Sequence, residues 1–244
     1  MTILSANICH TWPRRNFPAQ RMDDFVKMVH HYQADILLLQ EVWRSDMIHM
    51  HRWLANKLSM NLAYSRTNGD QRHIGFEEGL AILTRFPILA TRQKYLRSSL
   101  HPFARRQALA AEILTPCGKL WTASVHLSIA PWRNRRQILE LSHWLASVTD
   151  TAVIGGDFNA PDTSTRIKNL KQIWTDTLRW IHPAAEDVTT HQVELPLGKK
   201  IRQRIDYLFL KQDHPHWKIL DAGRILTHHV SDHLAIWTKF APIY

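Results

Sequence analysis

The sequence predicts a mixed α/β protein whose sheets are covered by helices. Strand-like apolar runs alternate with amphipathic helix-like runs along most of the 244 residues. The run DILLLQE at 35–41 is continuously apolar, which is typical of a strand covered on both faces. The chain has no internal repeat, low-complexity tract or break in composition. We therefore expect a single domain over residues 1–244.

Strands and helices alternate through the first half of the expected fold. The helix expected at 45–59 opens with Ser45 and Asp46, which together signal a helix N-terminus. A second helix is expected at 20–32, where apolar residues recur with helical spacing. The expected strands lie at 2–8, 35–41, 61–66, 78–86, 106–114 and 119–128.

The second half is expected to begin with helices on either side of a strand. The segment 131–147 starts with proline, which favours the first turn of a helix. The segment 163–174 carries a Ser/Thr cap signal and reads as a shorter helix. The expected strands lie at 151–159, 204–211, 217–223 and 233–240.

Charge and composition limit the classes of partner. The formal charge of +10 and the sequence pI of about 9.9 favour polyanions, either nucleic acid or an anionic membrane surface. No apolar run approaches the ~20 residues that a membrane span needs. Cys9 and Cys117 are too few for a disulfide framework, and we expect buried free thiols. The first ten residues read as a strand and not as a leader, so we expect a cytoplasmic protein, or a secreted one if a leader was removed. We also expect a monomer.

The stretch AVIGGDFNAP at 152–161 is a candidate for chemistry. In an extended chain Asp157 and Asn159 point to the same side, so a carboxylate and an amide would face one volume. The alternative is a strand that ends in an Asx turn before Pro161.

Other polar residues stand at or near the ends of the expected strands. Each alone has an ordinary explanation as a solvated strand end or a surface histidine. Together they suit metal-assisted attack on a phosphoester, because carboxylate and amide oxygens bind Mg²⁺ and imidazole transfers protons near neutral pH. The set is Asn7, Gln40, Glu41, Glu78, His126, Asp157, Asn159, Asp206, Asp232 and His233.

A zinc site is an alternative for the segment HHVSDH at 228–233. His229 and His233 stand four residues apart, a spacing that binds zinc on a helix. The residues that follow favour a strand, which argues against this arrangement.

The ordered segments SANI, LQE, EGLAILTRFPI, SVHLS, GGDFNAP, RIDYLFL and SDHLAI span residues 5–236. In this order they resemble the endonuclease/exonuclease/phosphatase superfamily, which includes deoxyribonuclease I and sphingomyelinases. The resemblance implies a four-layer α/β/β/α sandwich of two packed sheets flanked by helices. It also implies phosphoester hydrolysis that depends on Mg²⁺, for which Mn²⁺ could substitute.

The resemblance also implies where the metal binds. Glu41 would be a metal ligand, Asn7 would help to hold the metal or the phosphate, and Asp232 would be a further carboxylate on the metal side.

The remaining roles concern the water and the phosphate. By the same resemblance, Asp157 would position or deprotonate the attacking water, and Asn159 would bind phosphoryl oxygens. His233, oriented by Asp206, would act on the water or the phosphate. His126 would assist at the phosphate or leaving group, with Glu78 as its partner.

The substrate is left open between several classes. Basic clusters at 92–97, 105–106, 133–136, 166–171 and 199–204 suit a long polyanion, although each could also be a solvated face. The first hypothesis is a phosphodiesterase acting on nucleic acid, and the second is a phospholipid or sphingolipid headgroup phosphodiesterase. A binding protein on an inactive scaffold is a third, disfavoured because all the expected chemical residues are present. The histidine in SVHLS disfavours AP-site repair.

Overall fold

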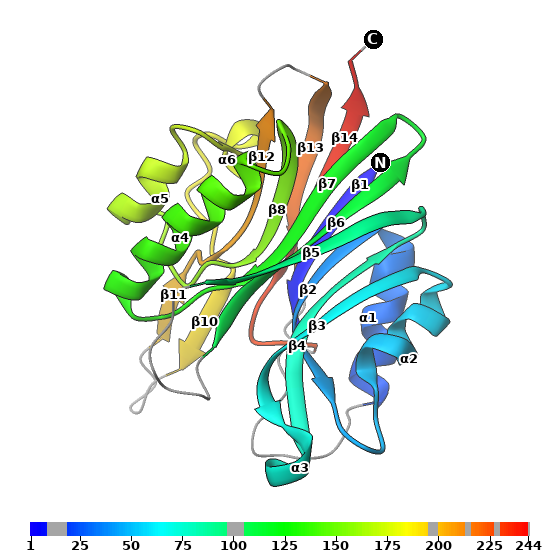
Figure 1. Ribbon diagram of the computed structural model, residues 1–244. Coiled ribbons are helices and arrows are strands. Elements are labelled where there is room, and N and C mark those ends of the chain that lie inside the picture. Colours follow the sequence, from blue (N-terminus) through cyan, green and yellow to red (C-terminus); the bar gives the residue numbers. More distant parts are fainter. Residues whose placement is uncertain (9–18, 97–104, 195–199, 213–215, 227–229, 244) are drawn as a thin grey trace.

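The computed structural model describes residues 1–8, 19–96, 105–194, 200–212, 216–226 and 230–243. Two six-stranded sheets pack face to face (Figure 1). Helices α1 and α2 cover the outer face of sheet one, and α4 and α5 cover the outer face of sheet two. The four-layer α/β/β/α arrangement expected from the sequence is confirmed.

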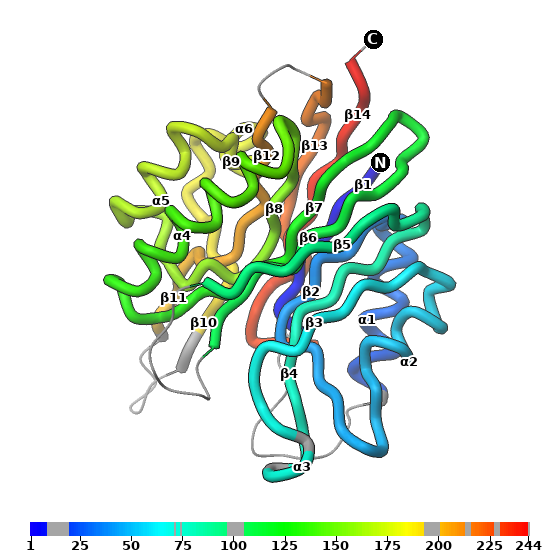
Figure 2. Tube along the Cα trace, viewed as in Figure 1, coloured from blue at the N-terminus to red at the C-terminus, as the bar shows by residue number. Residues whose placement is uncertain are grey.

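Sheet one has the strand order β13-β14-β1-β2-β4-β3, in which only β1 and β2 are parallel. Figure 2 shows the first strand in blue beside the last strand in red, so the two ends of the chain close one sheet. The elements are β1 Thr2–Asn7, α1 Ala19–His31, β2 Ile36–Arg44, α2 Met50–Leu58, β3 Asn61–Asp70, α3 Gln71–Ile74, β4 Phe76–Thr84, β13 Trp217–Ile225 and β14 Ala235–Pro242.

Sheet two has the order β5-β6-β7-β8-β12-β9, in which only β7 and β8 are parallel. A separate pair, β10 and β11, forms a small ribbon. The elements are β5 Ile88–Leu96, β6 Arg106–Thr115, β7 Gly118–His126, α4 Pro131–Ala146, β8 Thr151–Asp157, α5 Thr165–Leu170, β9 Thr175–Asp176, α6 Thr177–Ile181, β10 His191–Glu194, β11 Lys200–Gln203 and β12 Asp206–Gln212.

Alternating side chains divide the apolar residues among three core layers. Along β1, Ile3 belongs to the layer between the sheets, and Leu4 packs toward α1 and α2. Leu37 and Leu38 of β2 divide in the same way. This alternation explains why continuously apolar runs form strands here, because both faces of each central strand are covered.

Several expectations from the sequence need correction. Helix α2 begins at Met50 and not at Ser45, because the Ser45 hydroxyl accepts the Ile48 N–H in a turn that precedes the helix. Cys117 is exposed because it lies in the tight turn between β6 and β7, and Cys9 lies outside the described residues. Strand β5 was not predicted, because its exposed polar face reads as a basic cluster.

Among the described residues, no helix is long and apolar enough to cross a membrane.

His51 makes the stability of the fold sensitive to acid. It is 5% exposed on α2, and its ring stacks on Tyr64 with centroids 4.0 Å apart. Its Nδ1 is buried without a hydrogen-bond partner among the described residues. Burial, followed by the charges of His49 and Arg52, lowers the pKa of His51 to about 4.

We predict that the free energy of unfolding falls as pH decreases from about 6.5 to 4. In the unfolded chain His51 takes up a proton near its ordinary pKa of about 6.5, whereas in the folded chain it does so only near pH 4. Protonation between these two pH values therefore favours the unfolded chain. His51→Phe keeps the stacked ring without the titration and should flatten this acid limb in urea unfolding. His30→Gln, at an exposed position on α1, should behave like the wild type. Equal acid limbs in His51→Phe and wild type would contradict the assignment.

Candidate active site

The polar residues at strand ends converge where the two sheets meet. Sheet one contributes Asn7 at the end of β1 and Glu41 in β2, and sheet two contributes Asp157 at the end of β8. In the register of sheet two, Asp157 lies opposite Asp206 of β12 and beside His126 of β7. The site is therefore assembled across the contact between the sheets.

Asn7 links carboxylates from the two sheets. Its Nδ2 donates to Glu41 Oε1 at 3.1 Å and to Asp157 Oδ2 at 3.3 Å. Glu41 adopts the left-handed backbone conformation, with φ of 55°, inside a β-bulge of β2. Positive φ at a glutamate is uncommon, and bulges often redirect a side chain next to an active site. The buried Ser231 hydroxyl donates to the Asn7 carbonyl at 2.7 Å and holds the end of β1 in place.

A buried cluster of three charged groups forms the centre of the site. Asp157, Asp206 and His233 are each no more than 6% exposed. His233 Nδ1 lies 3.0 Å from Asp206 Oδ2, and His233 Nε2 lies 3.9 Å from Asp157 Oδ2. Burial lowers the pKa of His233, but the Asp206 and Asp157 carboxylates outweigh it and raise that pKa. Burial, followed by repulsion from Asp206, raises the pKa of Asp157.

The turn after β8 differs from the extended geometry expected for 157–159. Asn159 has a φ of 47°, and its N–H donates to Asp157 Oδ1 at 2.8 Å. This is the Asx turn that the sequence offered as the alternative, so the two side chains do not share a side through strand alternation. The Asn159 side-chain amide donates to the Leu127 carbonyl at 3.0 Å. Its contact with phosphoryl oxygens stays a prediction.

His126 and Glu78 lie on different sheets. His126 Nε2 lies 3.5 Å from Asp157 Oδ2, which places His126 beside the buried cluster. Glu78, on β4 of sheet one, accepts a hydrogen bond from Asn68 at 2.6 Å. The pairing of Glu78 with His126 stays a prediction.

His191 is a site residue that sequence reasoning missed. Its ring lies 4.3 Å from the His233 ring, and its Nε2 lies 3.7 Å from Asp232 Oδ2. The short strand β10 carries no motif, and a backbone bridge between His191 and His233 brings the two histidines together. Asp232 is half-exposed at the edge of the cluster. His228 and His229, which the zinc alternative needs, lie outside the described residues.

The donor atoms at the site fit a hard divalent cation. Glu41 and Asp157 accept hydrogen bonds from one amide group, so carboxylate oxygens from both sheets face a common volume. Asp157, Asp206 and His233 also offer ligand atoms that lie within 4.8 Å of one another. Mg²⁺ prefers such carboxylate oxygens.

The basic cluster at 199–204 contributes less free charge than its sequence indicates. Arg204 is 4% exposed and forms a buried pair with Asp176, at 2.6 Å between Nη2 and Oδ1. Arg202 pairs with Asp187 at 2.9 Å on the surface. Lys199 lies outside the described residues. Arg204 is therefore a structural residue and not part of a polyanion surface.

Comparisons with known proteins identify the family and the fold. The model of the endonuclease/exonuclease/phosphatase family matches residues 4–233. A comparison with curated proteins found no match.

Solved structures of this fold align along almost the whole chain. A family protein from Leptotrichia buccalis C-1013-b aligns with a TM-score of 0.81 at 19% identity and covers 99% of each chain. The human Nocturnin catalytic domain with bound sulfate aligns with a TM-score of 0.79 at 19% identity, covering 100% of this chain and 93% of Nocturnin. D. rerio TDP2 with a single-strand DNA product aligns with a TM-score of 0.79 at 16% identity, covering 99% of this chain and 98% of TDP2.

We predict that Asp157→Asn stabilises the metal-free protein at pH 7 by about 1–2 kcal/mol. The pKa of Asp157 is raised in the folded state, so this carboxylate opposes folding above its unfolded pKa of about 3.9. The gain should shrink as pH falls toward 4, where the unfolded state also binds a proton. Urea unfolding in EDTA at pH 7 and pH 4 measures both values.

Asp162→Asn is the matched control with the opposite sign. Asp162 accepts hydrogen bonds from Lys171 and Arg179, and these partners lower its pKa against the opposing effect of burial. Its neutralisation should therefore destabilise the protein at pH 7. If Asp157→Asn destabilises the fold by a similar amount, the electrostatic description of the cluster is wrong.

Proposed function

Since the chain belongs to the endonuclease/exonuclease/phosphatase family, we propose that it is a Mg²⁺-dependent phosphodiesterase that acts on nucleic acid. Members of this family hydrolyse phosphoester bonds, so the chain is a hydrolase. The observation that carries the finer proposal is the buried cluster of Asp157, Asp206 and His233, which Asn7 joins to Glu41 across the two sheets.

The electrostatics of the cluster suggest a division of labour in hydrolysis. Asp157, whose pKa is raised by burial, accepts a proton from the attacking water. The water oxygen forms a bond to phosphorus as the bond to the leaving oxygen breaks. His233, held protonated by Asp206, donates a hydrogen bond to the phosphoryl oxygen that gains negative charge. We assign His126, whose Nε2 lies 3.5 Å from Asp157 Oδ2, to protonate the leaving oxygen.

Glu41 and Asn7 are the proposed metal-side residues, with Asp232 as a further carboxylate nearby. A bound Mg²⁺, or Mn²⁺ in its place, supplies charge neutralisation at the phosphoryl oxygens. The Asn7 side-chain amide holds the Glu41 carboxylate by a hydrogen bond. The left-handed backbone at Glu41 turns that side chain away from the direction it would have in a regular strand.

Charge and neighbouring surfaces favour nucleic acid as substrate. The net charge of +10 suits a polyanion. Close to His126 in sequence, Trp132 is 59% exposed, and Arg133 lies over its ring at 4.6 Å. Exposed aromatic and arginine planes are what unpaired bases stack on. TDP2, which shares the fold, was solved with a single-strand DNA product.

A lipid headgroup is the second candidate substrate. Ile129 is 74% exposed in the loop after β7, three residues before the exposed Trp132, and apolar side chains of this kind enter membrane interfaces.

We predict that hydrolysis requires a divalent cation through Glu41. Activity on bis(p-nitrophenyl) phosphate should disappear in excess EDTA and return with Mg²⁺ or Mn²⁺. Glu41→Gln keeps the shape but removes a ligand charge, and should lower activity by about 10²-fold or more and raise the Mg²⁺ concentration needed. Glu112→Gln, on β6 between β5 and β7, is the control and should retain activity. Unchanged hydrolysis in EDTA would refute the metal mechanism.

A substrate panel separates the two candidates. In Mg²⁺ we expect cleavage of a single-stranded oligonucleotide or supercoiled plasmid that weakens steeply with added salt, because phosphate contacts release counterions. We expect little headgroup release from sphingomyelin or phosphatidylserine vesicles. Headgroup release without cleavage of DNA or RNA under the same conditions would replace the first candidate with the second.

A further inference from the structure

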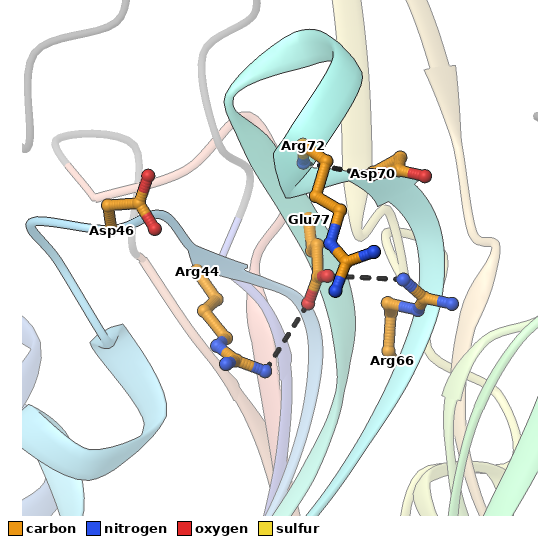
Figure 3. A pocket seen from close by; sticks show the side chains of 6 residues that line it. All are labelled: Arg44, Asp46, Arg66, Asp70, Arg72 and Glu77. Atoms are coloured by element: carbon orange, nitrogen blue, oxygen red, sulfur yellow. Dashed lines mark hydrogen bonds and ion pairs between the residues drawn. The ribbon is translucent and has the colours of Figure 1, made fainter.

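A charged cavity opens beside the candidate active site, at the end of sheet one. It has a volume of 620 Å³ (Figure 3). Strands β2, β3 and β4 and the short helix α3 contribute to its wall. Its lining residues are three arginines and three acids, namely Arg44, Arg66, Arg72, Asp46, Asp70 and Glu77.

A buried carboxylate organises two of the arginines. Glu77 is 6% exposed and accepts hydrogen bonds from Arg44 at 3.4 Å and from Arg66 at 3.1 Å. Each guanidinium has five N–H donors in a fixed plane, so one bond to Glu77 orients the group and leaves most of its donors unused. The Nε of Arg44 is buried and has no hydrogen-bond partner among the described residues.

The third arginine, Arg72, has a guanidinium group that no described side chain binds. Within the described part of the chain, the Arg72 guanidinium makes no hydrogen bond or ion pair, and Figure 3 shows it close to the Glu77 carboxylate and the Arg66 side chain. Asp70 does not neutralise it, because one Asp70 oxygen accepts the Arg72 backbone N–H at 2.8 Å and the other faces His73 at 2.9 Å. The cavity thus holds three guanidinium groups, of which two are bonded to Glu77, while Asp46 and Asp70 also line its wall.

The positions of the cavity residues along β2 and β4 show how near the cavity lies to the candidate active site. Arg44 follows Glu41 by three residues on β2, and Glu77 immediately precedes Glu78 on β4. At about 3.3 Å per residue, three residues of strand span about 10 Å. The bulge at Glu41 shortens that span, so a second phosphate a few nucleotides along one strand is within its reach.

We propose that Arg44, Arg66 and Arg72 bind a second phosphate of the substrate strand, a few nucleotides from the scissile phosphate. This inference rests on the proposed function, because it assigns a polyanionic strand to the same enzyme. Guanidinium groups bind phosphate through paired N–H donors. Glu77 holds two of the groups in place before the substrate arrives, and its own charge weakens the attraction for phosphate.

The test compares a substrate with many phosphates against one with a single phosphate. Arg66→Gln and Arg72→Gln should each raise KM for an eight-nucleotide single strand by roughly tenfold, the effect of one charge-assisted hydrogen bond, with kcat little changed. Hydrolysis of bis(p-nitrophenyl) phosphate, which cannot reach both positions, should change less than about twofold. Arg85→Gln, an exposed arginine just after β4, is the matched control.

Glu77→Gln distinguishes a binding role from a structural one. It keeps the size of the side chain and one acceptor oxygen for an arginine but removes the competing negative charge, so KM for the oligonucleotide should fall. If Glu77→Gln raises KM and lowers the melting temperature, and the arginine variants do the same, the cavity is structural and the inference is wrong.

A binding measurement separates this inference from the proposed function. Fluorescence anisotropy with a labelled oligonucleotide in EDTA measures strand binding without hydrolysis. Weaker binding by Arg72→Gln supports the phosphate site even if no nucleic acid is cleaved, in which case only the proposed function fails. Equal binding and equal KM for wild type, Arg66→Gln and Arg72→Gln overturn the inference and leave the proposed function standing.

Discussion

The close contact between the two sheets at Gly155 is the constraint on which the site depends. A Cβ at this position would lie 2.7 Å from a Leu38 methyl and 3.0 Å from the Ser5 Cβ, both on the opposite sheet. Next to this contact, Ser124 of sheet two donates to the Leu39 carbonyl of sheet one at 2.9 Å. Because the sheets approach so closely here, the strand ends that follow can share one amide, that of Asn7, between two carboxylates.

The chain treats its buried charges in two different ways. Arg204 and Asp176 are paired with short hydrogen bonds, so their burial is compensated. Asp157 is buried beside another carboxylate, and its pKa is raised as a result. Perturbed groups of this kind cluster at functional sites, because a rigid surrounding fold can hold them in an unfavourable environment. The packed inter-sheet layer provides that rigidity.

Local patterns predicted much of the fold, because strand ends and helix caps are encoded by neighbouring residues. Pro131 in the first turn of α4, the Ser164 cap of α5 and the polar end of β1 at Asn7 follow such rules. Long-range features could not be predicted in this way. His191 reaches the cluster through its bridge to His233, some forty positions later, and the left-handed backbone at Asn159 replaces strand alternation with a turn.

The bulge in β2 contains Glu41 of the candidate site and precedes Arg44 of the arginine cavity. Leu39 lies opposite Ala81, whereas Val42 lies opposite Gly79, so β2 contains one extra residue at this point. Continued without the bulge, the same register would place Trp43 opposite Glu77 and turn Arg44 to the other face of the sheet. The extra residue therefore does two things at once. It lets the Glu41 side chain turn toward Asn7, and it puts Arg44 on the same face of the sheet as Glu77, within hydrogen-bonding distance.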